Sequence, residues 1–410
     1  MIKAFKSNRI YCEDGIYDGY LLVEDEKVIG FSDECLTDYE VINFQDKRII
    51  PGIVDTHNHG TYGYLLEDIT VNGKAHVKGY LKSLASQGVT GVFPTCSSFS
   101  DFPSCSIAML KTIAEVAEED NDGATILGIH SEGPWLKRAG EKGGKVIVPD
   151  VDIDVAKKMV LDSNGWLKLV AVSPEIVDIK DTLDFFKTKG IILAFAHSDM
   201  YYKEATEAIK GNLTVATHLG NVMTGLHHRD VGGLGACLLN DDMTYEIICD
   251  GHHVSLEMLR IFFMIHDYDR FMMISDSSGM AGAPVGRYVG YKPGMTMNIA
   301  EDGYVTSDEG RVCGSSKSVL YGTGNLVEKL DIGLEDVIKM SSLNPCKKYG
   351  FDKEKGSLKM GKDADFVVID EDYSALYTYV KGKKVYDHLV DTDLLNYETL
   401  NRMKEEVHDI

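Results

Sequence analysis

The chain has 410 residues, of which 44% are hydrophobic and 26% are charged, fractions typical of a soluble globular protein rather than a disordered or membrane-embedded one. Its formal net charge of −22 excludes a duplex nucleic-acid binder, because such proteins need a basic face to neutralise phosphates. An anionic substrate would have to be held by local cations that work against the overall field.

The cysteines and the first residues indicate the compartment. Eight cysteines are scattered along the chain without a close CxxC pair, which fits free thiols in a reducing compartment. The opening MIKAFKSNRIYCEDG lacks the apolar stretch of a secretory signal, and no apolar run reaches the length of a membrane span. We therefore expect a cytoplasmic protein that has neither a membrane nor a nucleic acid as its partner.

In chain order, residues 1 to about 50 have the pattern of short strands and turns. From Arg48 onward, apolar β-type runs alternate with helical patterns, which is typical of parallel βα units. The predicted strands span residues 48–55, 90–95, 125–130, 168–172, 191–196, 213–217, 244–249 and 271–275. The predicted helices between them include residues 75–86, 107–118, 181–187, 202–208 and 256–266. Eight strands predict a (β/α)₈ TIM barrel in the α/β class.

Strand patterns return after the barrel, at residues 356–370 and 377–386, behind two predicted helices at 319–330 and 334–342. β segments at both ends of the chain, with a barrel between them, suggest that the two ends pair. The predicted domains are a discontinuous small β-sandwich of residues 1–50 and 346–387, a barrel of residues 51–345, and a polar C-terminal tail, 388–410, that is helical or frayed.

Side chains that can bind metals follow the predicted strands at their carboxyl ends, where the loops of a barrel surround its mouth. The first strand runs into PGIVDTHNHG, in which His57 and His59 face the same side of an extended chain. Other strand ends carry His130 and Glu132 in GIHSEGPW, His197 in AFAHSD, His218 in VATHLGN and Asp276 in MMISDSSG. A lone histidine is more often an ordinary core or surface residue, but five such strand ends in one barrel favour a shared site.

Histidine and carboxylate side chains are the ligands that zinc, iron and similar divalent ions take in proteins. An ion with an open coordination position lowers the pKa of water towards neutrality, so hydrolysis is the natural chemistry. An aspartate beside it can take a proton from the attacking water and return it to a leaving amine, and Asp276 is the candidate. The pattern decides neither the identity of the metal nor whether one or two ions bind per chain.

A series of short motifs runs through nearly the whole chain: PGIVDTHNHG, GIHSEGPWL, AHSDMYYKEA, ATHLGNVM, HHRDVGGLGA, CDGHHV, ISDSSGMAG, CGSSKSV, SSLNPCKKYG and GSLKMGKDADFVVID. In order and spacing they resemble the amidohydrolase superfamily, and more closely the N-acetylglucosamine-6-phosphate deacetylases. Each motif is weakly specific alone, whereas the series is strongly specific. The resemblance implies a metal-dependent deacetylase of an amino-sugar phosphate, commonly a homodimer.

The same resemblance implies roles for individual residues. One metal would be bound by Glu132, His197 and His218. His57 and His59 offer a second metal position, with Glu132 able to bridge, although some members of the family lack this pair and use one metal. Asp276 aligns with the acid/base aspartate of the family.

Substrate contacts are also implied by the matching motifs, at Asn221, Val222, His228, Arg229 and His253. Arg229 suits a phosphate because its guanidinium offers several donors in a planar fork, and the alternative is a surface ion pair with Asp230. In each adjacent histidine pair, 227–228 and 252–253, one functional member is expected.

Two lysines depart from the family pattern. Lys145, in GEKGGK, stands where the family usually has a histidine that polarises the substrate carbonyl, and an ammonium there can still donate to a developing oxyanion. Lys317 stands after the second serine of the GSS motif, where the family usually has an apolar residue. The lysines indicate a more negatively charged substrate or a tuned pocket for the same one, unless both simply face solvent.

Three functions remain open on the sequence alone. The favoured hypothesis is deacetylation of N-acetylglucosamine 6-phosphate by a metal-dependent amidohydrolase. The second keeps the barrel and the metal but changes the substrate, for example to N-acetylgalactosamine 6-phosphate. The third is a catalytically silent barrel that serves binding or assembly; it predicts a lost ligand or a lost Asp276, and neither is lost.

Overall fold

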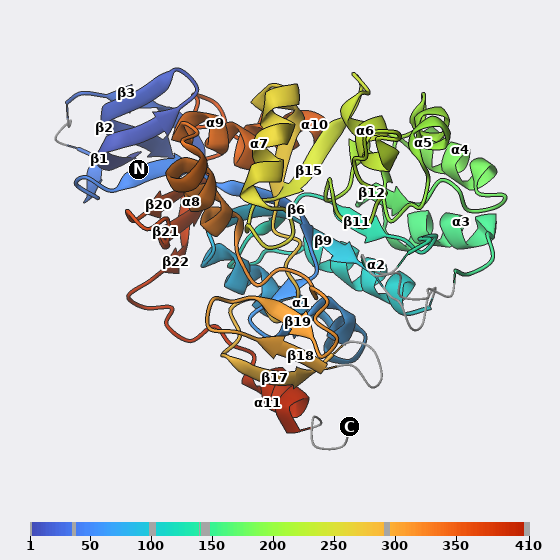
Figure 1. Ribbon diagram of the computed structural model, residues 1–410. Coiled ribbons are helices and arrows are strands. Elements are labelled where there is room, and N and C mark those ends of the chain that lie inside the picture. The colour runs from blue at the N-terminus through green and yellow to red at the C-terminus, as the bar shows by residue number, and fades with distance from the viewer. Residues whose placement is uncertain are drawn as a thin grey trace.

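The computed structural model describes residues 2–34, 38–97, 104–138, 140, 148–290 and 296–405 (Figure 1). Eight parallel strands form a barrel in the order of the chain. They are β6 (Ile53–Asn58), β9 (Val89–Cys96), β11 (Ile129–Glu132), β12 (Leu167–Val172), β13 (Ile192–Phe195), β14 (Val215–Ala216), β15 (Thr244–Ile248) and β16 (Phe271–Ile274), with the short β10 (Thr125–Ile126) also paired to β9.

The barrel closes between its last and first strands. The Asp276 amide donates to the His57 carbonyl at 2.9 Å, and the His59 amide donates to the Ser277 carbonyl at 2.8 Å. The strand segments are almost wholly buried, as expected where helices cover the outside of a parallel sheet. The predicted TIM barrel is therefore confirmed.

The covering helices bury their apolar faces against the strands in one large core. They are α1 (Ile69–Ala85), α2 (Ser104–Ala117), α3 (Ile153–Asp162), α4 (Lys180–Thr188), α5 (Tyr202–Ile209), α6 (Gly232–Leu238), α7 (Leu256–Ile265) and α8 (Val319–Leu330). The predicted set did not include α3 or α6. The sequence of α6, GGLGACL, is rich in glycine, a poor helix former, but its Gly233 lets the helix approach the Phe195 ring closely. Within the described residues, none of the helices combines the length and apolarity needed to cross a bilayer.

The predicted strand at residues 48–55 is wrong in one respect, because the structure divides it into two strands. β5 (Arg48–Pro51) pairs with a strand from the C-terminal part of the chain, whereas β6 begins the barrel at Ile53. Gly52 separates them, and a Cβ there would lie 2.1 Å from the Thr90 hydroxyl oxygen. The close approach requires glycine, and a continuous apolar run concealed the break.

Strands from both ends of the chain share a second sheet. It contains β1 (Ile2–Cys12), β2 (Gly15–Glu24), β3 (Lys27–Ser32), β4 (Glu40–Asn43), β5, β20 (Phe366–Ile369), β21 (Ala375–Val380) and β22 (Lys383–Asp387). The ring of Phe5 in β1 lies 5.0 Å from that of Tyr379 in β21, although three strand steps separate these strands. In a flat sheet three steps would span about 14 Å, so the sheet curls around its own apolar core.

The segment after the barrel contains α9 (Leu334–Ile338), a π-helical turn (Lys339–Leu343) and α10 (Asn344–Tyr349). Cys346 of α10 packs with Val54 and Phe93 of the barrel, so the residues just after the predicted boundary at 346 lie against the barrel. The domain boundaries themselves stay a prediction.

A further small sheet follows β16 and was not predicted. Its strands are β17 (Gly286–Val289), β18 (Thr296–Ile299) and β19 (Val305–Ser307), and Figure 1 shows α11 (Tyr397–Glu405) beside them. Leu400 and Met403 of α11 pack with Tyr288 and Met297 of this sheet. The part of the predicted tail at 397–405 is therefore helical and anchored by apolar contacts.

Candidate active site

The candidate ligands gather at the carboxyl ends of the barrel strands, as the sequence predicted. His57 lies in β6 and Glu132 is the last residue of β11. His197, His218 and Asp276 each lie two residues beyond their strands, with φ values of 50°, 32° and 47°. Such left-handed conformations cost a non-glycine residue of the order of 1 kcal/mol, and they gather at functional sites. His197, His218 and Asp276 all lie at the mouth of the barrel, so these unusual conformations mark it as a functional site.

One group of donor atoms consists of Glu132, His197 and His218. Glu132 Oε1 lies 3.1 Å from His197 Nε2 and 3.2 Å from His218 Nε2, and the two Nε2 atoms are 3.1 Å apart. His197 Nδ1 donates to the Arg138 carbonyl at 2.8 Å, which fixes the ring and leaves a lone pair at Nε2 of a neutral imidazole.

A second group of donor atoms adjoins the first. His57 Nε2 and His59 Nε2 lie 3.1 Å apart, and Asp276 Oδ1 is 3.4 Å from the former and 3.3 Å from the latter. Glu132 Oε2 lies 3.3 Å from His59 Nε2, so the carboxylate directs one oxygen towards each group. We refer to these six residues, His57, His59, Glu132, His197, His218 and Asp276, as the mouth cluster.

The mouth cluster fits a divalent cation. Lone pairs on oxygen and imidazole nitrogen that lie 3.1–3.2 Å apart repel one another unless a proton or a cation lies between them. Three donor atoms of each group also lie within 4.8 Å of one another, as for Glu132, His197 and His218 or His57, His59 and Asp276. Histidine nitrogen and carboxylate oxygen suit zinc and iron alike.

The shifted pKa values in the mouth cluster show that its carboxylates interact strongly with the neighbouring histidines. Burial alone would raise the pKa of Glu132, but hydrogen bonds from His197 and His218 hold it well below its usual value. Burial would likewise raise the pKa of Asp276, and the neighbouring His57 and His59 lower it. Burial lowers the pKa of His218, but the hydrogen bond with Glu132 raises it to about 9. Each carboxylate of the cluster is thus held ionised by its neighbours.

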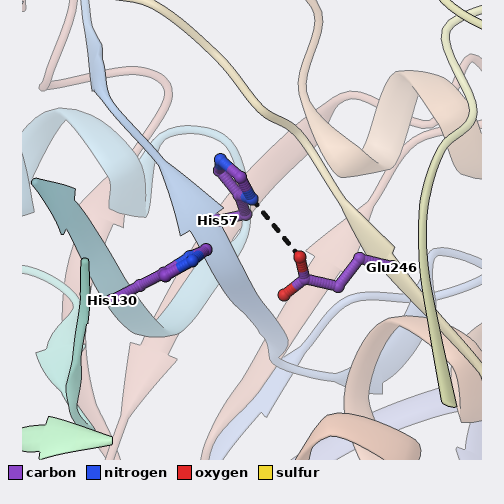
Figure 2. Close-up of side chains that lie close together, drawn as sticks. All are labelled: His57, His130 and Glu246. Atoms are coloured by element: carbon purple, nitrogen blue, oxygen red, sulfur yellow. Dashed lines mark hydrogen bonds and ion pairs between the residues drawn. The ribbon is translucent and has the colours of Figure 1, made fainter. Parts of the chain in front are cut away.

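Two further buried residues, Glu246 and His130, lie beside His57, as Figure 2 shows. His57 Nδ1 donates to Glu246 Oε2 at 3.3 Å, and the His130 ring meets His57 edge-on with centroids 4.5 Å apart. Burial holds the pKa of His130 well below its usual value, so His130 is neutral. Sequence reasoning missed Glu246, although an acidic residue inside the apolar run TYEIIC was an available signal.

A pocket of about 130 Å³ opens beside the mouth cluster. It is lined by His59, Leu65, Glu67, Ser97, Glu132, Asp276, Ser278, Gly279 and Gly314. Glu67 and Ser97 were not predicted, and nothing in the pattern around them distinguishes them from ordinary loop residues. Burial raises the pKa of Glu67, so the pocket combines carboxyl groups of different acidity. A small polar group can therefore enter next to Glu132 and Asp276.

The predicted substrate residues divide into buried and exposed ones, and among the described residues none of them lines that pocket. Asn221 is buried, its side chain donates to the His218 carbonyl at 3.3 Å, and Val222 follows with a φ of 52°. His253 Nδ1 lies 2.7 Å from Asp250 Oδ2. Burial would raise the pKa of Asp250, but the hydrogen bond with His253 lowers it to about 2.

His253 is connected to the mouth cluster through a short chain of hydrogen bonds. Ser315 Oγ donates to Asp250 Oδ2 at 3.0 Å, and the Ser315 amide donates to the Asp276 carbonyl at 3.0 Å. The strand-end loop that contains His253 is therefore linked to the backbone of Asp276.

The predicted phosphate residues, His228 and Arg229, lie in an exposed loop. Asp230 accepts hydrogen bonds from the amides of Tyr202 and Gly232, and within the described part of the chain it forms no ion pair with Arg229. Lys145 lies outside the described residues. Lys317 Nζ lies 4.7 Å from the centre of the Tyr321 ring, in cation–π contact.

Comparisons with known proteins agree with this geometry. The sequence model of the amidohydrolase family matches residues 48–390. The chain belongs to the amidohydrolase family. It is 30% identical to the N-acetylglucosamine-6-phosphate deacetylase of Vibrio furnissii over 342 residues, which cover 83% of each chain. It is 28% identical to the N-acetylgalactosamine-6-phosphate deacetylase of Escherichia coli O157:H7 over 386 residues, 93% of this chain and 99% of the relative.

A solved structure shows the same fold. The N-acetylglucosamine-6-phosphate deacetylase of Pasteurella multocida superposes on this amidohydrolase with a TM-score of 0.84 and 24% identity, covering 94% of this chain and 99% of the other. The predicted resemblance is confirmed, and the protein is a metal-dependent hydrolase of carbon–nitrogen bonds. The role of each site residue stays a prediction.

Proposed function

We propose that this amidohydrolase removes the acetyl group from N-acetylglucosamine 6-phosphate and releases glucosamine 6-phosphate and acetate. The observation that carries the proposal is the position of Asp276, in contact with His57 and His59 and on the wall of the pocket that Glu132 also lines. The similarity to the Vibrio furnissii deacetylase, over 83% of both chains, supports the choice of substrate.

We assign the metal to the mouth cluster. Glu132, His197 and His218 would hold one divalent ion, zinc or iron, and His57 and His59 a second, with Glu132 shared between the two. When bound, such an ion polarises a carbonyl and lowers the pKa of water.

Asp276 moves the proton in this proposal. Its carboxylate takes a proton from the water that attacks the acetamide carbonyl and gives it to the amine nitrogen as the C–N bond breaks. Two backbone hydrogen bonds fix the residue, one from its amide to the His57 carbonyl at 2.9 Å and one to its carbonyl from the Ser315 amide at 3.0 Å. The carboxylate is thereby held at the seam of the barrel, facing the site.

The remaining assignments concern the sugar. His253, with its Nδ1 engaged by Asp250, and Lys145 are the candidates for hydrogen bonds to the oxyanion. Asn221 and Val222 would contact the sugar, and His228 with Arg229 would bind its phosphate. The predicted cytoplasmic location and homodimer stay predictions.

The substrate assignment is tested by measuring acetate release from purified, metal-loaded protein. We expect N-acetylglucosamine 6-phosphate to be hydrolysed with a higher kcat/KM than N-acetylglucosamine, because the second compound lacks the phosphate. Protein that is inert towards every N-acetyl amino-sugar phosphate but active on another amide would overturn the substrate and leave the enzyme class in place.

The second candidate substrate is N-acetylgalactosamine 6-phosphate, because the Escherichia coli relative that carries this name matches 93% of the chain. The two sugars differ at one ring carbon, so a direct comparison of their kcat/KM values decides between them. A Lys145→His variant tests the position where the family usually has a histidine. If the variant hydrolyses N-acetylglucosamine 6-phosphate faster than wild type does, Lys145 adapts the pocket to another ligand.

A further inference from the structure

The carboxylate of Glu246 lies inside the barrel, below the mouth cluster, and the metal assignment above gives it no role. Glu246 is fully buried in β15, a strand that is otherwise apolar from Tyr245 to Ile248. Its Oε1 accepts a hydrogen bond from the Thr56 hydroxyl at 3.1 Å, and its Oε2 accepts one from His57 Nδ1 at 3.3 Å. Within the described residues, His57 is the one ion-pair partner of this carboxylate.

The chemistry of imidazole makes this contact decisive for His57. A neutral ring carries one N–H and one lone pair, and the partner of one nitrogen decides which nitrogen keeps the proton. An ionised carboxylate only accepts, so Glu246 places the N–H at Nδ1 and the lone pair at Nε2. That Nε2 lies 3.1 Å from His59 Nε2 and 3.4 Å from Asp276 Oδ1.

Among the described residues, the other histidines of the mouth cluster have no carboxylate at Nδ1. His59 Nδ1 lies 3.0 Å from the Thr95 carbonyl, and His197 Nδ1 lies 2.8 Å from the Arg138 carbonyl. Nδ1 of His218 is buried without a hydrogen-bond partner among the described residues. A carboxylate raises the basicity of an imidazole ligand more than a carbonyl does, so His57 differs from the other three.

His130 restricts the ring of His57 from another side, as Figure 2 shows. The two rings meet at 83° with centroids 4.5 Å apart, and both residues are fully buried. A His57 ring that lost Glu246 would therefore remain in place but would be free to carry its proton on Nε2, where a metal needs the lone pair.

We propose that Glu246 is a positioning residue that sets the tautomer of His57 and thereby determines whether the second metal position, at His57 and His59, is filled. The inference rests on the metal assignment made under the proposed function. The position at Glu132, His197 and His218 does not depend on Glu246, because His197 is oriented by Arg138.

The test counts metal ions with Zn²⁺ alone, by titration calorimetry and elemental analysis of the intact protein. We expect wild-type protein to bind two ions per chain. The Glu246→Gln variant should keep the first ion and bind the second about 10–100-fold more weakly, as when other hydrogen-bond partners of metal-binding histidines are removed. His57→Ala is the reference for protein that no longer binds the second ion. Glu246→Asp keeps the charge on a shorter side chain and should bind the second ion with an affinity between those of wild type and Glu246→Gln.

Thr56→Val is the matched control, because it removes the other hydrogen bond of Glu246 and leaves the contact with His57 intact. It should bind both ions like wild type. The proposal is overturned if E246Q binds two ions with unchanged affinities, if it loses both in parallel, or if T56V loses the second ion equally. Wild-type protein that binds a single ion also overturns it, and acetate release then shows whether the proposed deacetylase function survives.

Discussion

Two groups of charged residues in this amidohydrolase are built on opposite principles. At the second sheet, Lys355 Nζ lies 2.6 Å from Asp365 and 2.8 Å from Asp363, and Lys362 Nζ lies 3.1 Å from Glu13. We refer to these five residues as the lysine cluster. In the mouth cluster the carboxylates face imidazoles, and among the described residues no lysine or arginine forms an ion pair with them.

The difference shows which cluster serves structure and which serves chemistry. Each carboxylate of the lysine cluster faces a lysine, so the cluster can tie its loop to the turn after β1 through Glu13, and to β3 through Lys27, without a cofactor. The mouth cluster brings acceptors and lone pairs together, an arrangement that a divalent cation completes. Buried charges that the chain leaves unbalanced therefore identify the functional site.

Removal of metal should have the largest effect. Treatment with a chelator is expected to reduce acetate release to background and to lower the Tm, because an ion that binds only the folded state stabilises it, by about 2.7 kcal/mol at one hundred times its Kd. Activity and Tm measured before and after addition of Zn²⁺ or Fe²⁺ check this. An unchanged Tm with unchanged activity would show that the mouth cluster is complete without a cation.

Asp276→Asn should lower kcat by about 10²–10⁴-fold, because the amide can neither take nor return the proton. The Tm should stay close to that of wild type, since the backbone hydrogen bonds of residue 276 are retained. Asp154→Asn, a change in an exposed ion pair with Lys157, is the control and should leave kcat unchanged. Equal rates for D276N and wild type would remove Asp276 from the mechanism.

Lys355→Met should destabilise the fold by about 3–5 kcal/mol, because the buried Asp365 loses the lysine that it contacts and Asp363 keeps only the half-exposed Lys27 among the described residues. Metal content should not change, and denaturant unfolding with elemental analysis measures both. Lys27 pairs with the same Asp363 but is about half exposed, so Lys27→Met is the matched control and should cost at most about 1 kcal/mol. If the two variants were equally stable, the lysine cluster would be an ordinary surface feature.

Glu13→Gln should have the smallest effect, and a pH-dependent one. Burial raises the pKa of Glu13, but hydrogen bonds from Lys359, Ser357 and Lys362 lower it to about 2 in the folded protein, against 4.5 ordinarily. Its stabilisation is therefore complete above pH 4.5 and is lost as the pH falls towards 2. Because Glu13 is exposed and solvent screens its charge, the variant should be less stable by about 1 kcal/mol at most at neutral pH, and the difference should disappear in acid. A constant difference across that range would contradict this.

Much of the fold was predictable because barrel strands and helices have strong local signals. The strands at 90–95 and 244–249 were found within a residue or so of their observed bounds, since β-branched and apolar runs between helical patterns are typical of βα units. The sheet at β17–β19 was missed because its strands are three or four residues long and its core depends on α11, about a hundred residues later.

The barrel, the family and the residues of the mouth cluster were predictable from the sequence, because each depends on a local pattern: alternating elements, ordered motifs, and polar side chains that end apolar strands. Which atoms of these residues meet depends on the folded chain. The division of residues 48–55 between two sheets depends on the pairing of β5 with β20. The positions of the two oxygens of Glu132, and the contact of Glu246 with His57, 189 residues apart in the chain, depend on strands that meet only in the folded barrel. Pairings between distant residues leave no signature in a single sequence.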